Sequence, residues 1–164
     1  MTAPLAKPAS FTRLRLAFYN RPIGIFGWLT GLFAGKPYHV ELVFNDTLCY
    51  SSSTRADNSI GTRFQNKPGF PPPYWQFIEL DPQYAEKAWE FCIEEQGLPY
   101  DYYGVAIGWS YNCRPSPTRW FCSEVVSAAL MHAGMMFKSQ QPQYYTPRRL
   151  LLELSTPAPT ELVQ

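Results

Sequence analysis

Residues 38–53 read YHVELVFNDTLCYSSS, and this stretch decides the fold. Apolar and polar residues alternate on both sides of Asn45-Asp46, which is the period-two pattern of half-buried β-strands. Asparagine and aspartate are favoured in the tight turns of β-hairpins. We therefore expect two antiparallel strands, residues 38–44 and 47–53, joined by a two-residue turn at Asn45-Asp46.

The register of this predicted hairpin gathers polar side chains on one of its faces. With a two-residue turn, His39 lies opposite Ser52 and Glu41 lies opposite Tyr50. The other face is largely apolar and carries Val40, Leu42, Phe44, Cys49 and Ser51. A general base needs a polar neighbour that fixes the tautomer of its imidazole, and the polar face supplies one. The alternative is that this polar face simply contacts solvent.

A second feature is the stretch WFCSE at residues 120–124, which precedes an apolar run. The pattern predicts a helix over residues 122–133 that begins at Cys122 and ends before Gly134. Free N–H groups and the helix dipole at such a position lower the pKa of a thiol and favour the nucleophilic thiolate. A small cysteine buried in a core helix is the alternative, and Glu124 could serve only as a capping residue.

The remaining elements are predicted from hydrophobic periodicity and from proline and glycine at their ends. Strands are predicted at residues 12–19 and 75–80, and a loop is predicted over residues 54–73. Helices are predicted at residues 22–34, 81–96, 102–111 and 146–154. Short antiparallel strands mixed with helices indicate the α+β class. We expect an N-terminal arm (residues 1–10), one domain (residues 11–155) and a C-terminal tail (residues 156–164).

Composition and charge exclude several classes of function. The 164 residues carry a net charge of +1, so no basic excess suggests binding to nucleic acid. No charged and apolar leader opens the chain, and its longest apolar stretch, residues 23–35, is shorter than the roughly 20 residues that span a bilayer. We therefore expect no secretion signal, no transmembrane segment and a protein that is cytoplasmic when made. No metal or other cofactor is expected. The four cysteines lack the spacing signature of a metal site, although a zinc site or a cluster built from them stays open as an alternative.

A cysteine at a helix start together with a histidine on a strand is the arrangement of papain-like enzymes. Three short motifs carry the likeness further: YHVEL at residues 38–42, GLPYD at residues 97–101 and FCSE at residues 121–124. In their order they resemble the permuted NlpC/P60 family of the YiiX/YebB type, in which the histidine strand precedes the cysteine helix. The resemblance covers about residues 10–150, and the chain also looks like small phage-encoded members of this group.

This resemblance implies a circularly permuted papain-like fold in which an antiparallel sheet packs against helices. It implies that Cys122 is the nucleophile and His39 the base. Members of the family place a third polar group beside the base. In this sequence we expect Glu41 in that role first and Ser52 second, because Glu41 is the better charge partner for an imidazole.

Three aromatic residues are predicted to bind substrate. Tyr100 resembles the tyrosine that lines the site in this family, Tyr50 belongs to the predicted polar face, and Trp120 precedes the nucleophile. The aromatic residues in this part of the chain could form a groove for a peptide, a glycan or an acyl chain. Alternatively, they belong to the core and to a surface that faces a partner protein.

The leading hypothesis is a cysteine amidase or peptidase that acts on a cell-wall peptide of peptidoglycan and could be carried by a phage tail as part of the virion. A structural phage tail or tail-tip component with a peptidase-like fold and little or no activity is the second hypothesis. Low charge (16% of residues) and high aromatic content (16%) suit a chain that packs among tail proteins. A lipid acyltransferase or esterase is a further alternative, and so is a binding domain with an inactive site.

Overall fold

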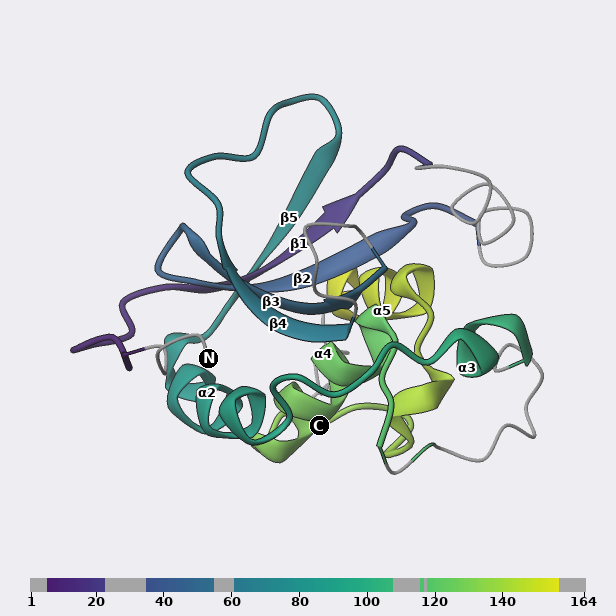
Figure 1. Ribbon diagram of the computed structural model, residues 1–164. Coiled ribbons are helices and arrows are strands. Elements are labelled where there is room, and N and C mark those ends of the chain that lie inside the picture. The colour runs from purple at the N-terminus through teal and green to yellow at the C-terminus, as the bar shows by residue number, and fades with distance from the viewer. Residues whose placement is uncertain (1–5, 23–34, 55–60, 108–115, 117, 157–164) are drawn as a thin grey trace, which may run out of the picture.

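A five-stranded antiparallel sheet is the centre of the structure (Figure 1). The computed structural model describes residues 6–22, 35–54, 61–107, 116 and 118–156. The strands are β1 (Leu14–Tyr19), β2 (His39–Phe44), β3 (Leu48–Ser53), β4 (Gly61–Asn66) and β5 (Trp75–Leu80), in the spatial order β4-β3-β2-β1-β5. β2 is therefore the central strand, and it pairs with β1 on one side and with β3 on the other.

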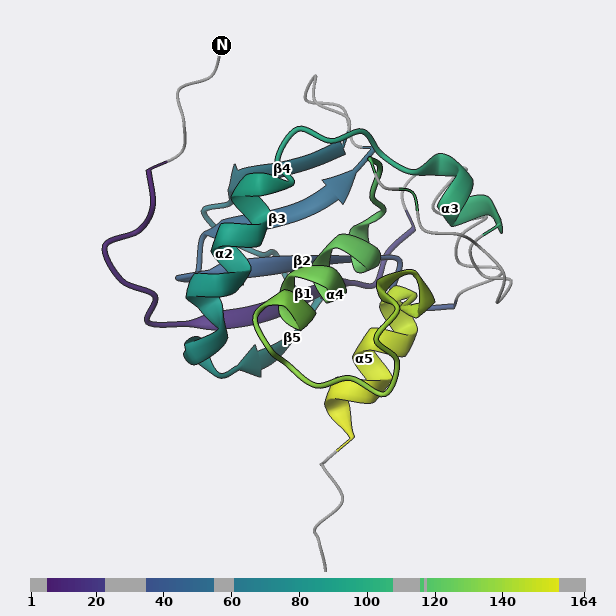
Figure 2. The same cartoon turned by 90° about the horizontal axis from the view of Figure 1, so that it is seen from below.

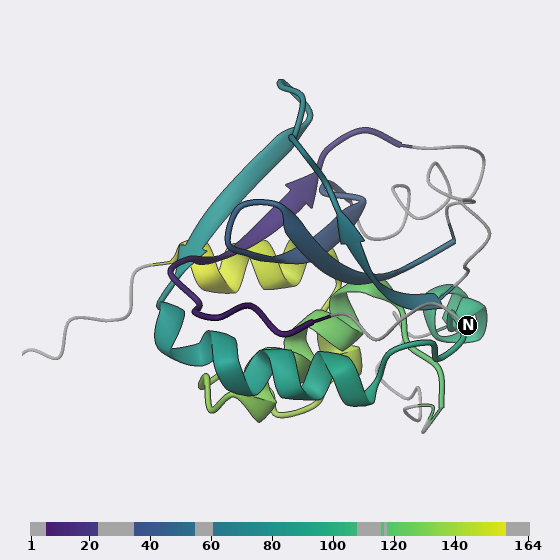
Figure 3. The same ribbon diagram turned by 60° about the vertical axis from the view of Figure 1, so that its left-hand side comes forward.

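Helices cover one face of this sheet. α2 (Ala85–Glu94), α4 (Cys122–His132) and α5 (Pro147–Ser155) lie across it in that order (Figure 2), and Figure 3 shows them beneath the strands. α3 (Tyr102–Ile107) lies apart from these three, and the 3-10 helices η1 (Pro82–Tyr84) and η2 (Pro142–Tyr144) precede α2 and α5. An antiparallel sheet with helices on one face confirms the predicted α+β class.

α4 is the buried centre of the helical layer, because every residue from 122 to 130 is buried. The helix contacts β2, β3 and α2. Val125 and Leu130 are fully buried, and they belong to one core cluster with Leu42 and Tyr50 of the sheet. Burying a valine or leucine side chain stabilises the fold by about 1.5–3 kcal/mol. This packing therefore fixes the start of α4 against the sheet.

Most predicted elements are present with somewhat different ends. The strands predicted at residues 12–19, 38–44 and 75–80 correspond to β1, β2 and β5, whereas the helix predicted at 81–96 is divided into η1 and α2. Several predictions fall outside the described residues: residues 23–34 of a predicted helix, 108–111 of another, 1–5 of the arm and 157–164 of the tail. Among the described residues, no helix combines the length and apolar character needed to cross a membrane.

The predicted register of the β2–β3 hairpin is wrong by one residue. Leu42 pairs with Tyr50 and Phe44 pairs with Leu48, so the turn holds three residues, 45–47, in place of two. Because side chains alternate along a strand, a shift of one residue moves every β3 side chain to the opposite face. Tyr50, which pairs with Leu42, therefore faces the helices, and Ser52 lies on that same face.

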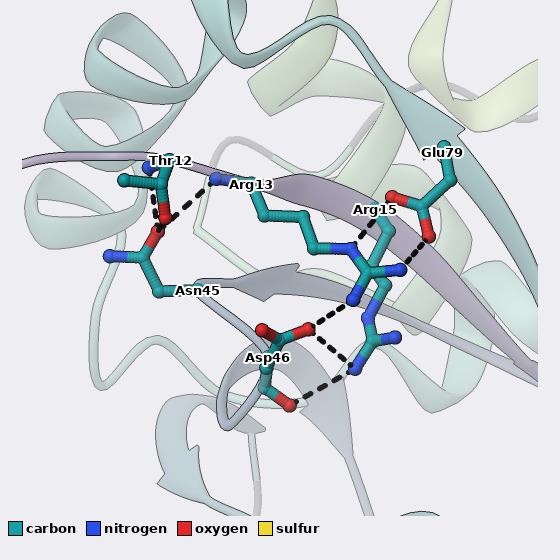
Figure 4. Close-up of polar contacts among 6 residues, drawn as sticks. All are labelled: Thr12, Arg13, Arg15, Asn45, Asp46 and Glu79. Atoms are coloured by element: carbon teal, nitrogen blue, oxygen red, sulfur yellow. Dashed lines mark hydrogen bonds and ion pairs between the residues drawn. The ribbon is translucent and has the colours of Figure 1, made fainter.

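Contacts with β1 and with the two residues before it explain this turn, and Figure 4 shows them. The Asn45 side-chain carbonyl accepts hydrogen bonds from the backbone N–H groups of Thr12 (2.9 Å) and Arg13 (3.3 Å). The Asp46 carboxylate forms ion pairs with Arg13 (2.6 Å) and Arg15 (3.4 Å). Both turn residues have a positive φ, which asparagine and aspartate tolerate better than most residues. The conformation of the turn thus depends on contacts with a third segment, residues 12–15, which hairpin propensity alone does not include.

The loop predicted over residues 54–73 contains a strand, β4, and that prediction was wrong. β4 pairs along the whole of β3, for example through Tyr50 with Phe64 and Ser51 with Arg63. Its sequence, GTRFQN, holds a single large apolar residue. Phe64 packs against Tyr50 and against Trp89 of α2, with ring centroids 4.8 and 4.5 Å apart. A short, polar edge strand with one anchoring side chain gives almost no periodic signal.

Candidate active site

Cys122 and His39 come together where the first turn of α4 meets the first residue of β2. Cys122 opens α4, directly after the extended N-cap residue Phe121. The Cys122 thiol forms a hydrogen bond with the His39 imidazole, and backbone N–H groups of Val40 and Ser123 also donate to its sulfur. The two side chains are nearly enclosed, since Cys122 is 6% exposed and His39 is 9% exposed.

The interaction between the two groups shifts both of their pKa values. Burial by itself raises the pKa of a thiol and lowers that of an imidazole. For Cys122, the hydrogen bond and positive charge of His39 together with the two backbone N–H groups outweigh burial, so its pKa lies below the ordinary value. For His39, burial is likewise outweighed by hydrogen bonds to Cys122 and Glu41, so its pKa is raised. The shifts favour a thiolate beside an imidazolium, the reactive form of such a pair.

Glu41 holds the other side of the imidazole. Its Oε1 atom lies 3.1 Å from Nε2 of His39, which leaves Nδ1 as the ring nitrogen for Cys122. Both residues belong to β2 and are two positions apart, so the strand places them on the same face. Burial opposes the charge of Glu41, but the hydrogen bond to His39 and the nearby Lys67 hold the pKa of this carboxyl at about 2. Glu41 is therefore ionised at neutral pH.

Lys67 is a site residue that the sequence did not reveal. Its Nζ atom lies 2.5 Å from Oε1 and 2.6 Å from Oε2 of Glu41. Lys67 follows β4 directly, within the segment that was predicted as a loop. A lone lysine in a polar stretch carries no pattern of its own, and only the pairing of β4 with β3 brings it to the site. Lys67 could have been predicted from the sequence only if β4 had first been recognised as a strand.

Ser52 and Tyr50 do not lie beside His39, and the predictions that placed them there are corrected. The Oγ atom of Ser52 donates a hydrogen bond to the backbone carbonyl of Trp120 at 2.6 Å. Tyr50 is fully buried in the core against Phe64, where no substrate can reach it. Both corrections have the same cause, the register shift that turns these β3 side chains toward the helices. Ser52 instead fixes the chain two residues before the nucleophile.

Tyr100 and Trp120 are the other two aromatic residues predicted to bind substrate. Their backbones pair with each other in an isolated parallel β-bridge. Burial, followed by the negative charge of the nearby Cys122, raises the pKa of Tyr100. The Trp120 indole instead donates to Glu95 at 2.7 Å and packs against Phe91. Tyr100 therefore lies near Cys122, while the ring of Trp120 lies against the end of α2.

The first turn of α4 contains two further buried polar side chains. Glu124 accepts a long hydrogen bond, 3.5 Å, from the backbone N–H of Phe121. Burial, together with the negative charge of the nearby Asp101, raises the pKa of Glu124 to about 8 against the effect of this bond. Ser123 is fully buried, and its hydroxyl has no hydrogen-bond partner among the described residues. Glu124 therefore acts as a neutral capping group at the helix start, as one sequence interpretation expected.

No group of three or more His, Cys, Asp or Glu side chains within the described ranges could hold a metal ion. The described cysteines (Cys49, Cys92 and Cys122) are free thiols, and Cys113 lies outside the described residues. Comparison with known proteins adds no identification: no protein-family model matches the chain, and no curated protein or solved structure matches it significantly. Any function of this protein must therefore be argued from the arrangement of its own residues.

Proposed function

We propose that this protein is a cysteine amidase or peptidase in which Cys122 is the nucleophile, His39 the general acid and base, and Glu41 the residue that orients His39. The observation that carries the proposal is the hydrogen-bonded pair of Cys122 and His39 with Glu41 on the other ring nitrogen. Nucleophile, base and orienting group in this order are the three parts that covalent acyl transfer requires.

The reaction would begin with attack of the Cys122 thiolate on an amide carbonyl. The carbon–sulfur bond forms while the carbonyl electron pair moves to oxygen, and backbone N–H groups at the start of α4, that of Cys122 among them, stabilise this oxyanion. His39 then gives its proton to the leaving amine as the carbon–nitrogen bond breaks. In the second half, His39 takes a proton from water, the resulting hydroxide attacks the thioester, and the thiolate is released.

We propose a peptide of the bacterial cell wall as the substrate, presented to the enzyme as peptidoglycan. The resemblance of the three motifs to the permuted NlpC/P60 family supports this class, and so does the order of the elements, since β2 with His39 precedes α4 with Cys122. The same resemblance supports a circularly permuted papain-like fold and delivery on a phage tail. The tyrosine beside the thiol, Tyr100, would line the substrate channel.

The test is hydrolysis of purified peptidoglycan and of synthetic stem peptides, and the measured signal is the appearance of new amino groups. Cys122→Ala and His39→Ala should each lower the rate by about 1000-fold or more, because the residues of such a site act as a unit. Cys92→Ala is the matched control, since Cys92 is a buried cysteine in the core cluster, and it should retain the activity. Vesicles containing phospholipid form a parallel arm: acyl release there and none from peptides would assign a lipid acyltransferase or esterase. Absence of turnover in every arm would leave the structural tail component.

A further inference from the structure

We propose that Lys67 is a positioning residue that clamps the Glu41 carboxylate and balances its charge, and that it thereby sets the pH range over which Cys122 and His39 exist as an ion pair. This inference rests on the proposed function, because it concerns the regulation of the same site. Glu41 alone would orient the imidazole, but an uncompensated carboxylate would also repel the thiolate and hold the imidazolium proton too tightly.

The geometry of Lys67 supports a clamp. One ammonium group contacts both oxygens of Glu41, at 2.5 and 2.6 Å, and the nearer of these oxygens, Oε1, also lies 3.1 Å from Nε2 of His39. A carboxylate held by both oxygens has one orientation toward the imidazole. The result is a continuous chain, Lys67–Glu41–His39–Cys122, that runs from the end of β4 through β2 to the first turn of α4.

Lys67 is itself held in place from two sides. Its backbone N–H donates to the carbonyl of Thr47 at 2.7 Å, which ties it to the β2–β3 turn. Its Nζ atom lies 5.0 Å from the centre of the Trp75 ring, so an aromatic face covers the ammonium group. The side chains of Lys67 and Glu41 are only 17% and 7% exposed. Solvent therefore screens this pair weakly, and its charges act on the neighbouring site.

The other charged and titratable groups near Glu41 do not replace Lys67. Cys49 of β3 lies close to Glu41, but burial raises the pKa of its thiol to about 12, so it is neutral. Arg15 of β1 is engaged elsewhere, because its guanidinium lies over the Phe77 ring and pairs with Asp46. On the α4 side of the pair lie Tyr100, Asp101 and Glu124, none of which is a cation. Arg63 of β4 lines the same pocket as Glu41, but its guanidinium donates to the backbone carbonyls of Ser53 and Gly61. Lys67 is thus the cation whose ammonium group contacts both oxygens of Glu41.

The sign of the expected effect follows from the charges. Removing a positive charge near a thiol and an imidazole raises the pKa of each, because it disfavours the thiolate and favours the imidazolium. The Lys67 ammonium and Nε2 of His39 contact the same oxygen, Oε1 of Glu41, at 2.5 and 3.1 Å, so the two groups are close neighbours. At an effective dielectric constant of about 20, one charge at such a range shifts a pKa by about one unit or more. Lys67→Met should therefore move the acid limb of Cys122 reactivity upward by about one pH unit. In the hydrolytic reaction, the alkaline limb should move in the same direction.

The experiment measures the rate of alkylation of Cys122 by iodoacetamide between pH 4 and 9, with the modified residue identified by peptide mass spectrometry. Lys67→Arg keeps the charge, and its acid limb should stay within about 0.3 pH unit of wild type. Lys7→Met is the matched control: Lys7 also pairs with a glutamate, Glu86, at 2.6 Å, but on the exposed side of α2. Its profile should superimpose on that of the wild-type protein. Thermal unfolding of each variant shows that the protein is folded.

A folded Lys67→Met protein whose acid limb coincides with that of wild type, or moves downward, would overturn the inference. If Lys67→Met loses its cooperative unfolding transition, Lys67→Gln, which keeps a hydrogen-bond donor without the charge, replaces it under the same criterion. Failure of the proposed function has a different signature. In that case Cys122 of the wild-type protein would titrate as an ordinary thiol, and there would be no low-pH limb for Lys67 to move.

Discussion

Replacing Glu41 by glutamine removes one negative charge from the site and keeps the size and hydrogen-bonding shape of the side chain. In the protein, Oε1 of Glu41 lies 3.1 Å from Nε2 of His39. Two unit charges at that distance attract each other by about 5 kcal/mol at an effective dielectric constant of about 20. Lys67 cancels part of this attraction, because it contacts the same carboxylate, and glutamine can still accept a hydrogen bond from the ring.

A net loss of about 1.4–3 kcal/mol remains, which corresponds to a fall of about one to two units in the pKa of His39. The carboxylate is a hydrogen-bond partner of the imidazole, so it stabilises the imidazolium more than it destabilises the thiolate. The equilibrium therefore shifts from thiolate and imidazolium toward neutral thiol and neutral imidazole. We expect Glu41→Gln to lower the thiolate fraction of Cys122 near pH 6 by about 10-fold or more.

The assay is the rate of Cys122 alkylation by iodoacetamide at pH 6, together with thiolate absorbance in the ultraviolet, compared with Glu86→Gln. Glu86 is the control because it is also paired with a lysine but lies on the exposed surface of α2. Equal alkylation rates and equal thiolate absorbance in wild type and Glu41→Gln would refute the reasoning. Glu41 would then be a structural carboxylate with no influence on the thiol.

Two further predictions concern residues around the helix start. Ser52→Ala removes the 2.6 Å hydrogen bond to the Trp120 carbonyl and should lower the free energy of unfolding in urea by about 1–2 kcal/mol. Cys122 should keep its alkylation rate in this variant. A large loss of thiol reactivity would instead show that Ser52 belongs to the catalytic site. Glu124 has a pKa raised to about 8, so its buried neutral form stabilises the fold most below its unfolded pKa of about 4.5, and that stability is lost as pH rises through 8. The free energy of unfolding in urea should therefore fall less between pH 5 and 8 for Glu124→Gln than for the wild type. Equal falls in the two proteins would contradict this assignment.

The sequence was sufficient for the parts of the site that depend on local patterns. The alternation around His39 predicted β2, and the apolar run after Cys122 predicted a helix that begins at the cysteine. Glu41 could be predicted beside His39 because two residues of one strand, two positions apart, share a face whatever the strand pairs with.

The parts that depend on tertiary contacts could not be predicted. The hairpin register was wrong because Asn45 and Asp46 bond to residues 12–15, at the start of β1 and just before it, and this one shift removed Tyr50 and Ser52 from the face of His39. Lys67 was missed for a related reason. β4 has one large apolar side chain, Phe64, and its position is decided by packing against the core and by pairing with β3, neither of which leaves a periodic pattern.

The most direct measurement is the apparent pKa of the Cys122 thiol, obtained from the pH dependence of its alkylation in the wild-type protein and in His39→Gln. The account predicts that the Cys122 thiol of the wild type titrates below its ordinary value, because His39 stabilises the thiolate, and that its pKa rises when His39 is replaced. A Cys122 thiol that titrates near its ordinary value of about 8.5 in both proteins would contradict it.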